Sequence, residues 1–214
     1  MVVVVGGSST PFGKVPVVIH NGNTIYESLV TCEYIEDVFP GVKLHSENPA
    51  QRAKDRMLVE VFNKVIMPLM RIWFGAKRGF AAEDRARQWT ESMENLKLFE
   101  RELETRGADG FFSCEDRPGW LDYMVWPWFE RIDAFFETYK VTTFRLCINY
   151  PQLFFIQEPG VKFQRDEFPV LSSWMERMLS DEAVREYLLD TETHSRFMAT
   201  VASGSPNYNM LSQS

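Results

Sequence analysis

The sequence has few cysteines, no long apolar run and a deficit of positive charge, and each shortage excludes a class of protein. Its three cysteines, Cys32, Cys114 and Cys147, are too few and too widely spaced for a disulfide framework or a Cys-x-x-Cys metal site. No stretch approaches the roughly 18 consecutive apolar residues of a membrane span. Residues 1–5 are too short for the apolar core of a signal peptide. These shortages predict a cytoplasmic protein with no membrane partner.

Charge and motif content exclude two further kinds of partner. The chain has 23 Lys and Arg against 30 Asp and Glu, so its net charge is −7. A negative chain repels the phosphate backbone, and nucleic acid is therefore not an expected partner. The sequence contains no dinucleotide-binding, P-loop, zinc-protease or serine-hydrolase motif. Its histidines, His20, His45 and His194, are scattered and form no ligand pattern, so no metal is predicted.

Aromatic residues and methionines, by contrast, are abundant. Aromatics make up 14% of the 214 residues and there are 10 methionines, within an apolar fraction of 45%. This apolar fraction excludes intrinsic disorder, and the length corresponds to about one and a half domains. So many aromatic side chains indicate thick helix packing or an apolar ligand pocket.

The beginning of the chain carries β-strand signals. Residues 1–10 hold a valine run of high strand propensity, followed by a Gly-Gly-Ser-Ser segment that predicts a loop. Residues 15–19 and 24–26 are β-rich runs on either side of an Asn-Gly pair, which is the strongest short-range signal of a hairpin. The sequence therefore predicts a strand pair near the amino terminus.

Helical periodicity dominates after the hairpin. Apolar residues recur at spacings of three and four, the pattern of a buried helix face. The stretch richest in apolar residues, 120–129, would be apolar on nearly every face of a helix and is predicted to be the central, buried helix. The polar segment from residue 203 onward is expected to fray. Helices are predicted at about residues 27–38, 57–73, 89–103, 120–137 and 168–189.

Glu27 and Ser28 form the local feature that suggests a ligand site. They follow a short strand and open a helix, where backbone N–H groups and the Ser28 hydroxyl would hold a carboxylate. The Glu27 carboxylate would pair with an ammonium group, so the two residues suit the end group of an α-amino acid. Pro16 on the preceding strand would leave neighbouring backbone groups free to bond an extended peptide. A simple helix N-cap is the alternative interpretation.

Two parts of the sequence resemble a known family. PFGKVPVV, the hairpin and YESLVTCEYIEDVFPG resemble the second half of the thioredoxin-like domain of glutathione transferases. LDYMVWPWFERI resembles the central helix of the omega class, and the similarity continues through LSSWMERM. It covers nearly all of residues 11–140 and 161–200. The resemblance implies an α+β, mostly α fold, with a partial thioredoxin-like, glutathione-binding domain at 1–45 and an all-helical domain at 46–214.

The resemblance also implies residue roles and an activity. Val15, Pro16, Glu27 and Ser28 become glutathione-binding residues, with Pro16 in a cis peptide, and Phe197 is assigned to the second-substrate pocket. Glutathione is the implied co-substrate in thiol transfer and in the reduction of small oxidised or electrophilic compounds, dehydroascorbate among them. A related insect member makes a pteridine eye-pigment precursor, which is kept as a further substrate. A homodimer is implied where the amino-terminal domain is complete.

The sequence departs from the family at the catalytic segment. The omega class uses a cysteine in a Cys-Pro-Phe/Tyr segment before the Pro-Phe-Gly of residues 11–13, and residues 1–10 do not supply it. Cys32 lies within the helix after Glu27-Ser28 and is not the nucleophile by position. The first strand, helix and second strand, with the lysine that contacts glutathione, are also absent. No catalytic residue is therefore assigned and weak or no thiol transfer is expected, with a non-catalytic scaffold or a gene-model product as the alternative.

Asp122 is interpreted as structural rather than catalytic. It lies in the first turn of the central helix, where a carboxylate favours the helix dipole and accepts free backbone N–H groups. Gly119 stands where the family has a serine cap, and glycine caps a helix less well by a few tenths of a kcal/mol. Asp122 is therefore expected to be a buried structural cap.

Residues 141–157 form a second departure, because the family joins the flanking helices more directly. Val141 must be encoded by a codon that begins with GT, and the end of the segment through Gln157 is compatible with a pyrimidine-rich run closing in CAG. We interpret the segment as a translated short intron, with a functional insertion loop as the alternative. A transcript that lacks these 17 codons would support the intron, and one that keeps them would exclude it. Residues 1–10 are likewise interpreted as unrelated to the true start of the family sequence.

Overall fold

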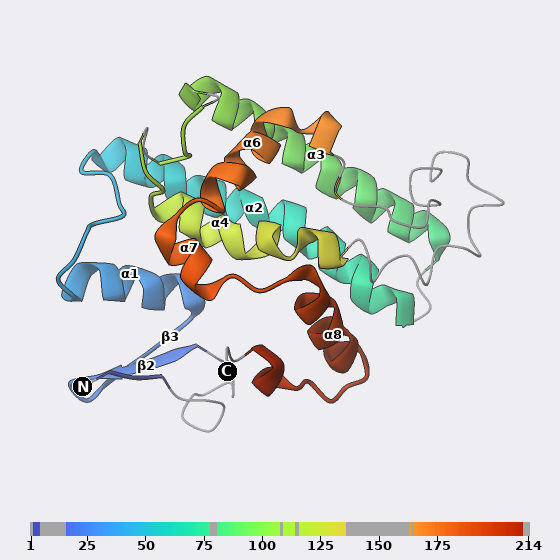
Figure 1. Cartoon of the computed structure of the whole chain (residues 1–214), viewed down its shortest axis with the longest axis horizontal. Coiled ribbons are helices and arrows are strands. Elements are labelled where there is room, and N and C mark those ends of the chain that lie inside the picture. The colour runs from blue at the N-terminus through green and yellow to red at the C-terminus, as the bar shows by residue number, and fades with distance from the viewer. Residues whose placement is uncertain are drawn as a thin grey trace. The chain divides into compact units, whose positions relative to one another are not determined.

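The chain divides into two compact units, residues 1–45 and residues 46–214, in the computed structural model. Its helices far outnumber its strands, which confirms the α+β, mostly α class (Figure 1). The segment expected to be an insertion, residues 141–157, lies outside the described part of the chain. The structure describes residues 2–4, 16–77, 81–107, 109–113, 116–135, 163 and 165–211.

A three-stranded antiparallel sheet opens the amino-terminal unit. β1 (Val2–Val4) pairs with β2 (Val17–His20), and β2 pairs with β3 (Asn23–Tyr26). The turn between β2 and β3 has positive φ at Asn21 and Gly22, 50° and 79°, as a two-residue type I′ hairpin requires. The predicted hairpin is confirmed, and the valine run adds a third strand to it.

α1 (Ser28–Val38) follows β3 and packs on the sheet. His20 of β2 and the hydroxyl of Tyr34 of α1 share a hydrogen bond of 2.9 Å, which joins strand and helix. After the helix, the Glu36 carboxylate accepts the backbone N–H of Leu44 at 2.7 Å, so the following loop is tied back to α1. The first contact joins α1 to the hairpin, and the second joins α1 to the loop that follows it.

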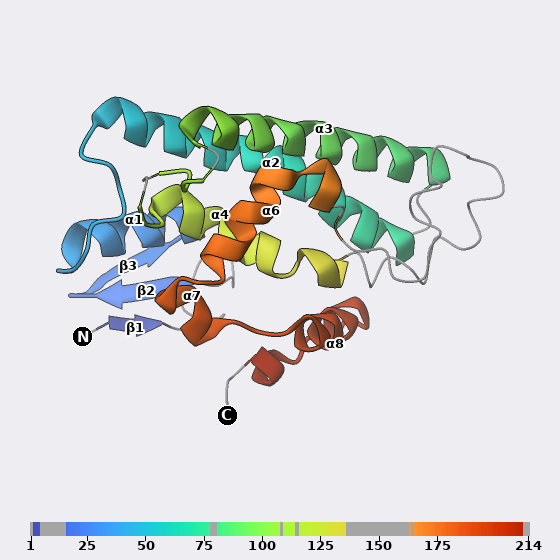
Figure 2. The ribbon, with the colours of Figure 1, turned by 45° about the horizontal axis from the view of Figure 1, so that its top comes forward.

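Two long helices form the frame of the second unit. α2 (Pro49–Lys77) and α3 (Ala82–Gly107) run side by side (Figure 2). Between them the Phe62 and Phe99 rings meet edge to face, with centroids 5.1 Å apart. The apolar period of three and four residues places both rings on the inner faces.

Pro68 lies inside α2 without ending it. A proline in a helix removes one N–H donor and disturbs the bonding of the carbonyls one turn before it. The hydroxyl of Ser92 on α3 donates to the Val65 carbonyl oxygen at 2.7 Å, within that disturbed turn. The carbonyl that loses its helical donor is that of Lys64, and the bond from Ser92 supports the next carbonyl of the same turn.

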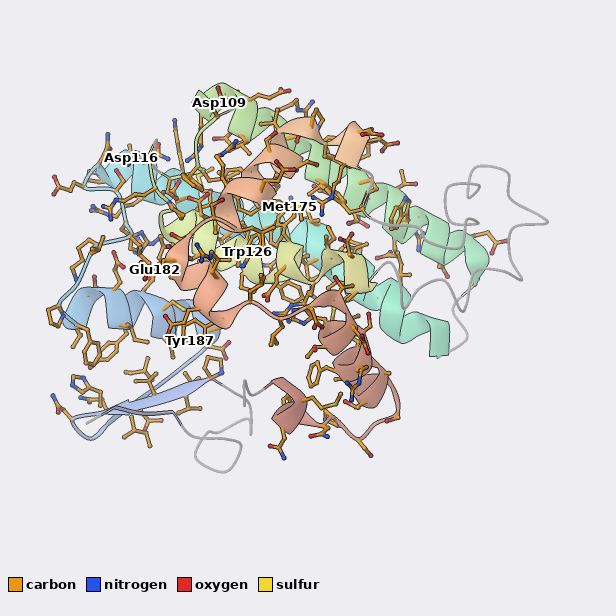
Figure 3. All side chains as sticks on the ribbon, viewed as in Figure 1. Asp109, Asp116, Trp126, Met175, Glu182 and Tyr187 are labelled. Carbon is orange, nitrogen blue, oxygen red and sulfur yellow. The ribbon has the colours of Figure 1, made fainter. Side chains whose placement is uncertain are left out.

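α4 (Trp120–Glu130) is the buried helix that its apolar sequence predicts. Trp126 of α4 and Met175 of α6 (Pro169–Met178) lie in the interior of this unit (Figure 3). The ring of Trp174, also on α6, lies 5.0 Å from that of Phe129. The abundant aromatic residues thus serve to pack α4 against its neighbours.

The prediction of one helix over residues 168–189 is wrong, because the segment forms two. α6 ends at Met178, and α7 (Glu182–Tyr187) begins after Asp181. The Asp181 carboxylate accepts the Val184 N–H at 3.1 Å, an N-cap that starts a new helix in a new direction.

The last helix, α8 (Thr191–Ala202), is joined to α4 by a buried polar contact. His194 Nε2 lies 3.3 Å from Glu130 Oε1, which also accepts the Leu189 N–H at 2.9 Å. Beyond α8 the chain forms a further 3₁₀ turn, η4 (Tyr208–Leu211), so the expectation that this tail frays is wrong for those residues. A 3₁₀ turn, η3 (Arg165–Glu167), precedes α6. Among the described helices none is both long and apolar enough to cross a membrane.

Tyr123 of α4 provides a pH-dependent link to α7, because its hydroxyl donates to Asp181 Oδ1 at 3.0 Å. Burial, followed by the hydrogen bond to this carboxylate and its charge, raises the pKa of Tyr123 to about 12. An unfolded tyrosine ionises near pH 10. The contribution of the protonated Tyr123 hydroxyl to the stability of the folded chain is therefore complete below about pH 10 and is lost as the pH rises through about 12.

We expect Tyr123→Phe to remove this alkaline loss of stability, measured as the pH dependence of chemical unfolding. Asp181→Asn should keep the α7 cap, since asparagine caps as well as aspartate, while it moves the phenol ionisation back toward pH 10. Titration of tyrosinate absorbance measures that shift. An unchanged titration curve in Asp181→Asn would contradict the assignment.

Candidate functional site

The junction of β3 and α1 has a strained backbone. Glu27 adopts φ 71° and ψ 120°, a conformation that a residue with a side chain rarely takes. Such a residue costs on the order of 1–3 kcal/mol, and strain of this kind is concentrated at functional sites. Glu27 and Ser28 are both exposed, so burial does not explain the conformation. The outlier therefore supports a ligand-binding role for this junction.

The amino terminus of α1 is open. Glu27 occupies the N-cap position, and among the described residues no side chain caps the helix. The N-cap interpretation of this junction therefore holds for the position of Glu27 but not for a capping side chain, and Ser28 is the first helical residue. The first intrahelical bond runs from Thr31 N–H to the Glu27 carbonyl at 2.8 Å, and the Thr31 hydroxyl donates to the Ser28 carbonyl at 2.8 Å. In the first turn Ser28 and Val30 are exposed and Leu29 is half-buried.

The strand register brings Pro16 to the same place. Val17 pairs with Tyr26, so the residues immediately outside this pair, Pro16 and Glu27, lie across from each other at one end of the hairpin. Pro16, Glu27 and Ser28, predicted from separate parts of the sequence, are thus neighbours in the structure. Val15, the fourth predicted residue, lies outside the described part of the chain, as does its peptide bond to Pro16.

This arrangement presents two opposite polarities. Free N–H groups and the positive end of the helix dipole attract an anion at Ser28. The Glu27 carboxylate, one residue earlier, attracts a cation. An α-amino acid end group carries both charges on one carbon and fits this pair. The described residues hold no cluster of three metal-ligating side chains here or elsewhere.

Cys32 is the described cysteine nearest to this junction in the sequence, one helical turn after Ser28. Its thiol is half-buried on α1. Burial, and to a lesser degree the charge of Glu33, raises the pKa of the Cys32 thiol. A raised pKa favours the unreactive thiol over the thiolate, which is the nucleophile. The surroundings of Cys32 therefore disfavour its thiolate.

Asp122 lies in the helical unit, where its carboxylate joins α4 to the preceding loop and to α6. Its side chain is completely buried and accepts four hydrogen bonds. Oδ1 accepts the Phe112 N–H at 2.9 Å and the Trp174 indole N–H at 2.8 Å. Oδ2 accepts the N–H groups of Ser113 at 3.1 Å and Gly119 at 2.9 Å. Burial raises the pKa of this carboxyl, and the four donors oppose that rise.

Ser113 supplies the cap that Gly119 lacks. Gly119 is the N-cap of α4 and has no side chain to accept a helix N–H. The hydroxyl of Ser113, from the preceding loop, accepts the Leu121 N–H at 3.1 Å instead. The first turn of α4 therefore obtains from a loop residue the bond that an N-cap serine would have made.

Phe197, predicted for a second-substrate pocket, lies half-buried on α8. Its ring centroid is 5.5 Å from that of Tyr208 on η4. Sequence reasoning missed Tyr208 because it lies in a polar tail. The helix-stop signal of Gly204 followed by Ser-Pro-Asn would have indicated a turn there. No sequence signal predicted the strained conformation of Glu27, since glutamate has no preference for positive φ.

Two family models match the chain. The model of the glutathione S-transferase N-terminal domain matches residues 8–37, which contain Pro16, Glu27 and Ser28. The model of the glutathione S-transferase C-terminal domain matches residues 82–177. The first match begins within the ten residues expected to be unrelated to the family, and the second spans the segment 141–157.

Curated proteins from animals are similar over most of the chain. A pyrimidodiazepine synthase of Drosophila melanogaster is 33% identical over 94% of this chain and 72% of its own length. Glutathione S-transferase omega-2 of Rattus norvegicus is 32% identical over 88% of this chain and 64% of its own length. Glutathione S-transferase omega-1 of Mus musculus is 28% identical over 92% of this chain and 69% of its own length. The chain thus spans between about three fifths and three quarters of these relatives.

Solved structures share the fold. A Tau class glutathione S-transferase from mango, Mangifera indica, superimposes with a TM-score of 0.69 at 22% identity, over 89% of this chain and 76% of its own. Glutathione transferase Omega 3C from Trametes versicolor gives a TM-score of 0.62 at 20% identity, over 90% and 71%. A rice enzyme solved in complex with glutathione gives 0.65 at 23% identity, over 89% and 76%.

Proposed function

This chain belongs to the glutathione transferase family, with omega-class enzymes among its relatives, and from this premise we propose that its amino-terminal unit binds glutathione through Glu27 and Ser28. Ser28 and the open turn of α1 receive the carboxylate of the γ-glutamyl end, and Glu27 receives its ammonium group. Val15 and Pro16 border the extended peptide backbone. The observation that carries the proposal is the uncapped α1 amino terminus beside a strained, exposed glutamate.

The reaction we propose for the family type is glutathione-dependent thiol transfer and reduction. In thiol transfer the enzyme thiolate attacks the glutathione sulfur of a substrate–glutathione disulfide, so that the substrate thiol leaves and an enzyme–glutathione disulfide forms. A second glutathione, as its thiolate, then attacks this disulfide, which releases the enzyme thiolate and glutathione disulfide. With dehydroascorbate as the substrate, two glutathione molecules lose two electrons and two protons and form glutathione disulfide, while dehydroascorbate becomes ascorbate. Phe197 is proposed to line the second-substrate pocket. The protein is proposed to act in the cytoplasm, and as a homodimer where the amino-terminal domain is complete.

The 214-residue chain is proposed to bind glutathione while turning it over weakly. The sequence contains no Cys-Pro pair, the segment in which the omega class carries its nucleophile. Cys32, whose thiol pKa is raised by burial, is a poor replacement. The rival function is therefore a non-catalytic protein of the same fold that keeps part of the glutathione site. An assay of dehydroascorbate reduction separates the two, since turnover well above the uncatalysed rate would contradict weak activity.

A second candidate substrate follows from the relative in Drosophila melanogaster, which is named a pyrimidodiazepine synthase and is 33% identical to this chain. Formation of a pyrimidodiazepine would use the same glutathione site. Parallel assays of dehydroascorbate reduction and of pyrimidodiazepine formation distinguish the two candidates. A faster rate of pyrimidodiazepine formation would favour the synthase.

Ser28→Ala tests the glutathione site. It removes one hydroxyl donor to the carboxylate but keeps a residue that favours helix, so we expect the dissociation constant for glutathione to rise about tenfold. Glu27→Gln removes the partner of the ammonium group and should weaken binding by a similar factor. Isothermal titration calorimetry on the full chain measures both.

Asp37→Asn is the matched control, because Asp37 is an exposed carboxylate at the other end of the same helix. It should leave the affinity for glutathione unchanged. The site assignment fails if Ser28→Ala and Asp37→Asn bind glutathione equally well, or if the unchanged chain does not bind it.

A further inference from the structure

The tip of the β2–β3 hairpin carries an asparagine followed by a glycine. Asn21 and Gly22 are its two turn residues, and both are exposed. A Cβ atom built at Gly22 would meet no described atom within 4 Å beyond those of its chain neighbours, so the tip is open to water. His20 pairs with Asn23, and the turn residues therefore lie outside the strand ladder. This Asn-Gly pair is the only one in the sequence.

An asparagine that precedes glycine can react with its own backbone. The Gly22 nitrogen, once it has lost its proton, attacks the side-chain Cγ of Asn21, and a C–N bond forms. The side-chain NH₂ group takes up a proton and leaves as ammonia, so that a five-membered cyclic imide remains. Water opens the imide at either carbonyl and gives aspartate or isoaspartate, in which the main chain runs through the side-chain carbons. Overall, one amide and one water become one carboxylate and one ammonium ion.

The turn conformation prepares Asn21 for this ring closure. The imide ring requires a ψ angle of about −120° at the asparagine, the value at the first central residue of a type II′ turn. That position also requires positive φ, and Asn21 already has φ 50°. Rotation of the single peptide between the turn residues converts type I′ into type II′, and both turns suit a two-residue hairpin. The rotation reverses the sign of φ at Gly22, which is 79° in the structure, and glycine tolerates both signs.

The two products affect the hairpin differently. Aspartate keeps the turn, because Asp-Gly suits type I′ as Asn-Gly does. Isoaspartate lengthens the main chain between His20 and Asn23, so the loop no longer fits the pairing of these two residues. His20 also shares the 2.9 Å hydrogen bond with Tyr34, and its ring centroid lies 5.0 Å from that of Phe39. A change at the tip therefore reaches the contacts that join the hairpin to α1.

We propose that Asn21 is a site of spontaneous, irreversible modification, and that its conversion to isoaspartate loosens the hairpin and its attachment to α1. The reaction consumes only water, and hydroxide accelerates it because the Gly22 nitrogen must lose a proton. The turn sequence thus limits the chemical lifetime of the amino-terminal unit. This inference does not depend on the assignment of the glutathione site.

The test is incubation of the full chain in mildly alkaline buffer, followed by peptide mapping. Mass spectrometry with electron-transfer fragmentation measures aspartate and isoaspartate at each asparagine. Asn23 is the internal control, because it is exposed in the same hairpin but lies in the extended conformation of β3 and precedes Thr24. The left-handed conformation that Asn21 already has would cost Asn23 the equivalent of about five- to thirtyfold, so Asn21 should convert faster by at least about fivefold.

Asn21→Gly is the matched variant, since Gly-Gly also suits a type I′ turn and has no side-chain amide. Hydrogen–deuterium exchange of β2 and β3 is measured before and after incubation. Exchange should become faster in the isoaspartate-containing fraction of the unchanged chain and stay constant in Asn21→Gly. Freshly prepared Asn21→Asp should exchange as slowly as the fresh unchanged chain, because normal aspartate keeps the turn.

The proposal is overturned if Asn21 converts no faster than Asn23, or if the isoaspartate-containing chain exchanges as slowly as the fresh chain. It is also overturned if Asn21→Gly gains the same exchange on incubation, since the change would then have another origin. Titration of the fresh chain with glutathione is a separate measurement. Absence of binding there would overturn the glutathione site and leave the conversion of Asn21 untouched.

Discussion

Replacing Asp122 by alanine is expected to unfold the helical unit under conditions in which the unchanged chain remains folded. The carboxylate is completely buried and accepts three backbone N–H groups and the indole N–H of Trp174. Each buried donor left without an acceptor costs about 1–3 kcal/mol, and the removed side chain leaves a void as well. We expect a loss of roughly 4 kcal/mol, a large part of the stability of a domain.

Asp122→Asn separates the hydrogen bonds from the volume of the side chain. Asparagine fills nearly the same space, but it replaces one acceptor oxygen by an NH₂ group that faces N–H donors. We expect it to cost about 3 kcal/mol, slightly less than alanine. Tryptophan fluorescence during denaturant unfolding measures this unit selectively, because all six tryptophans lie beyond residue 45.

Ser113→Ala is the control for this network. The Ser113 hydroxyl oxygen accepts one hydrogen bond, from Leu121 N–H, and its loss should cost about 1 kcal/mol, as for a helix cap. Equal destabilisation by Asp122→Asn and Ser113→Ala would show that Asp122 acts as an ordinary cap and not as the centre of a network. Glutathione binding should be unchanged in Ser113→Ala.

Replacing Glu100 is expected to give the second largest loss, because this side chain caps a helix other than its own. The N-cap of α6, Phe168, has no polar side chain, and Pro169 at the first helical position has no N–H. The N–H groups of Val170 and Leu171 therefore depend on Glu100, whose two carboxylate oxygens lie 2.7 and 2.8 Å away. Glu100 is 8% exposed, so water replaces it poorly.

We expect Glu100→Ala to cost about 3 kcal/mol, since it leaves one buried and one partly buried donor unpaired and removes a negative charge from the positive end of a helix. Glu100→Gln keeps one acceptor oxygen and should cost about half as much. Both are measured by denaturant unfolding followed by tryptophan fluorescence. Glu104→Gln, an exposed position one turn further along α3, should change stability by less than about 0.5 kcal/mol.

The outcome that would contradict the cross-helix cap is a loss in Glu100→Gln no larger than in Glu104→Gln. The two buried carboxylates, on different helices, both bind α6. Asp122 accepts the indole N–H of Trp174, and Glu100 accepts N–H groups of the first turn of α6. Their effects are therefore expected to be less than additive, since either change already loosens α6. The double variant measures this coupling.

Local interactions explain what was predictable from the sequence. The hairpin depends on Asn21 and Gly22, which adopt positive φ values that these residue types favour. No distant partner is needed for this turn. The long helices depend on apolar spacing alone, and the buried α4 depends on its apolar circumference. Glu27 and Ser28 were recognised as a candidate because a strand-to-helix junction is visible within a few residues.

The sequence by itself thus determined the hairpin, the long helices and the residue types at the candidate glutathione site. Only the tertiary structure decided the features whose partners lie far apart in the chain. Glu100 meets Val170 and Asp122 meets Trp174 across separations of 70 and 52 residues, and no local pattern encodes such pairs. The positive φ of Glu27 and the closure of Tyr208 on Phe197 likewise depend on how neighbouring elements constrain the backbone. Short-range preferences select the elements, and the satisfaction of buried polar groups across elements selects how they are joined.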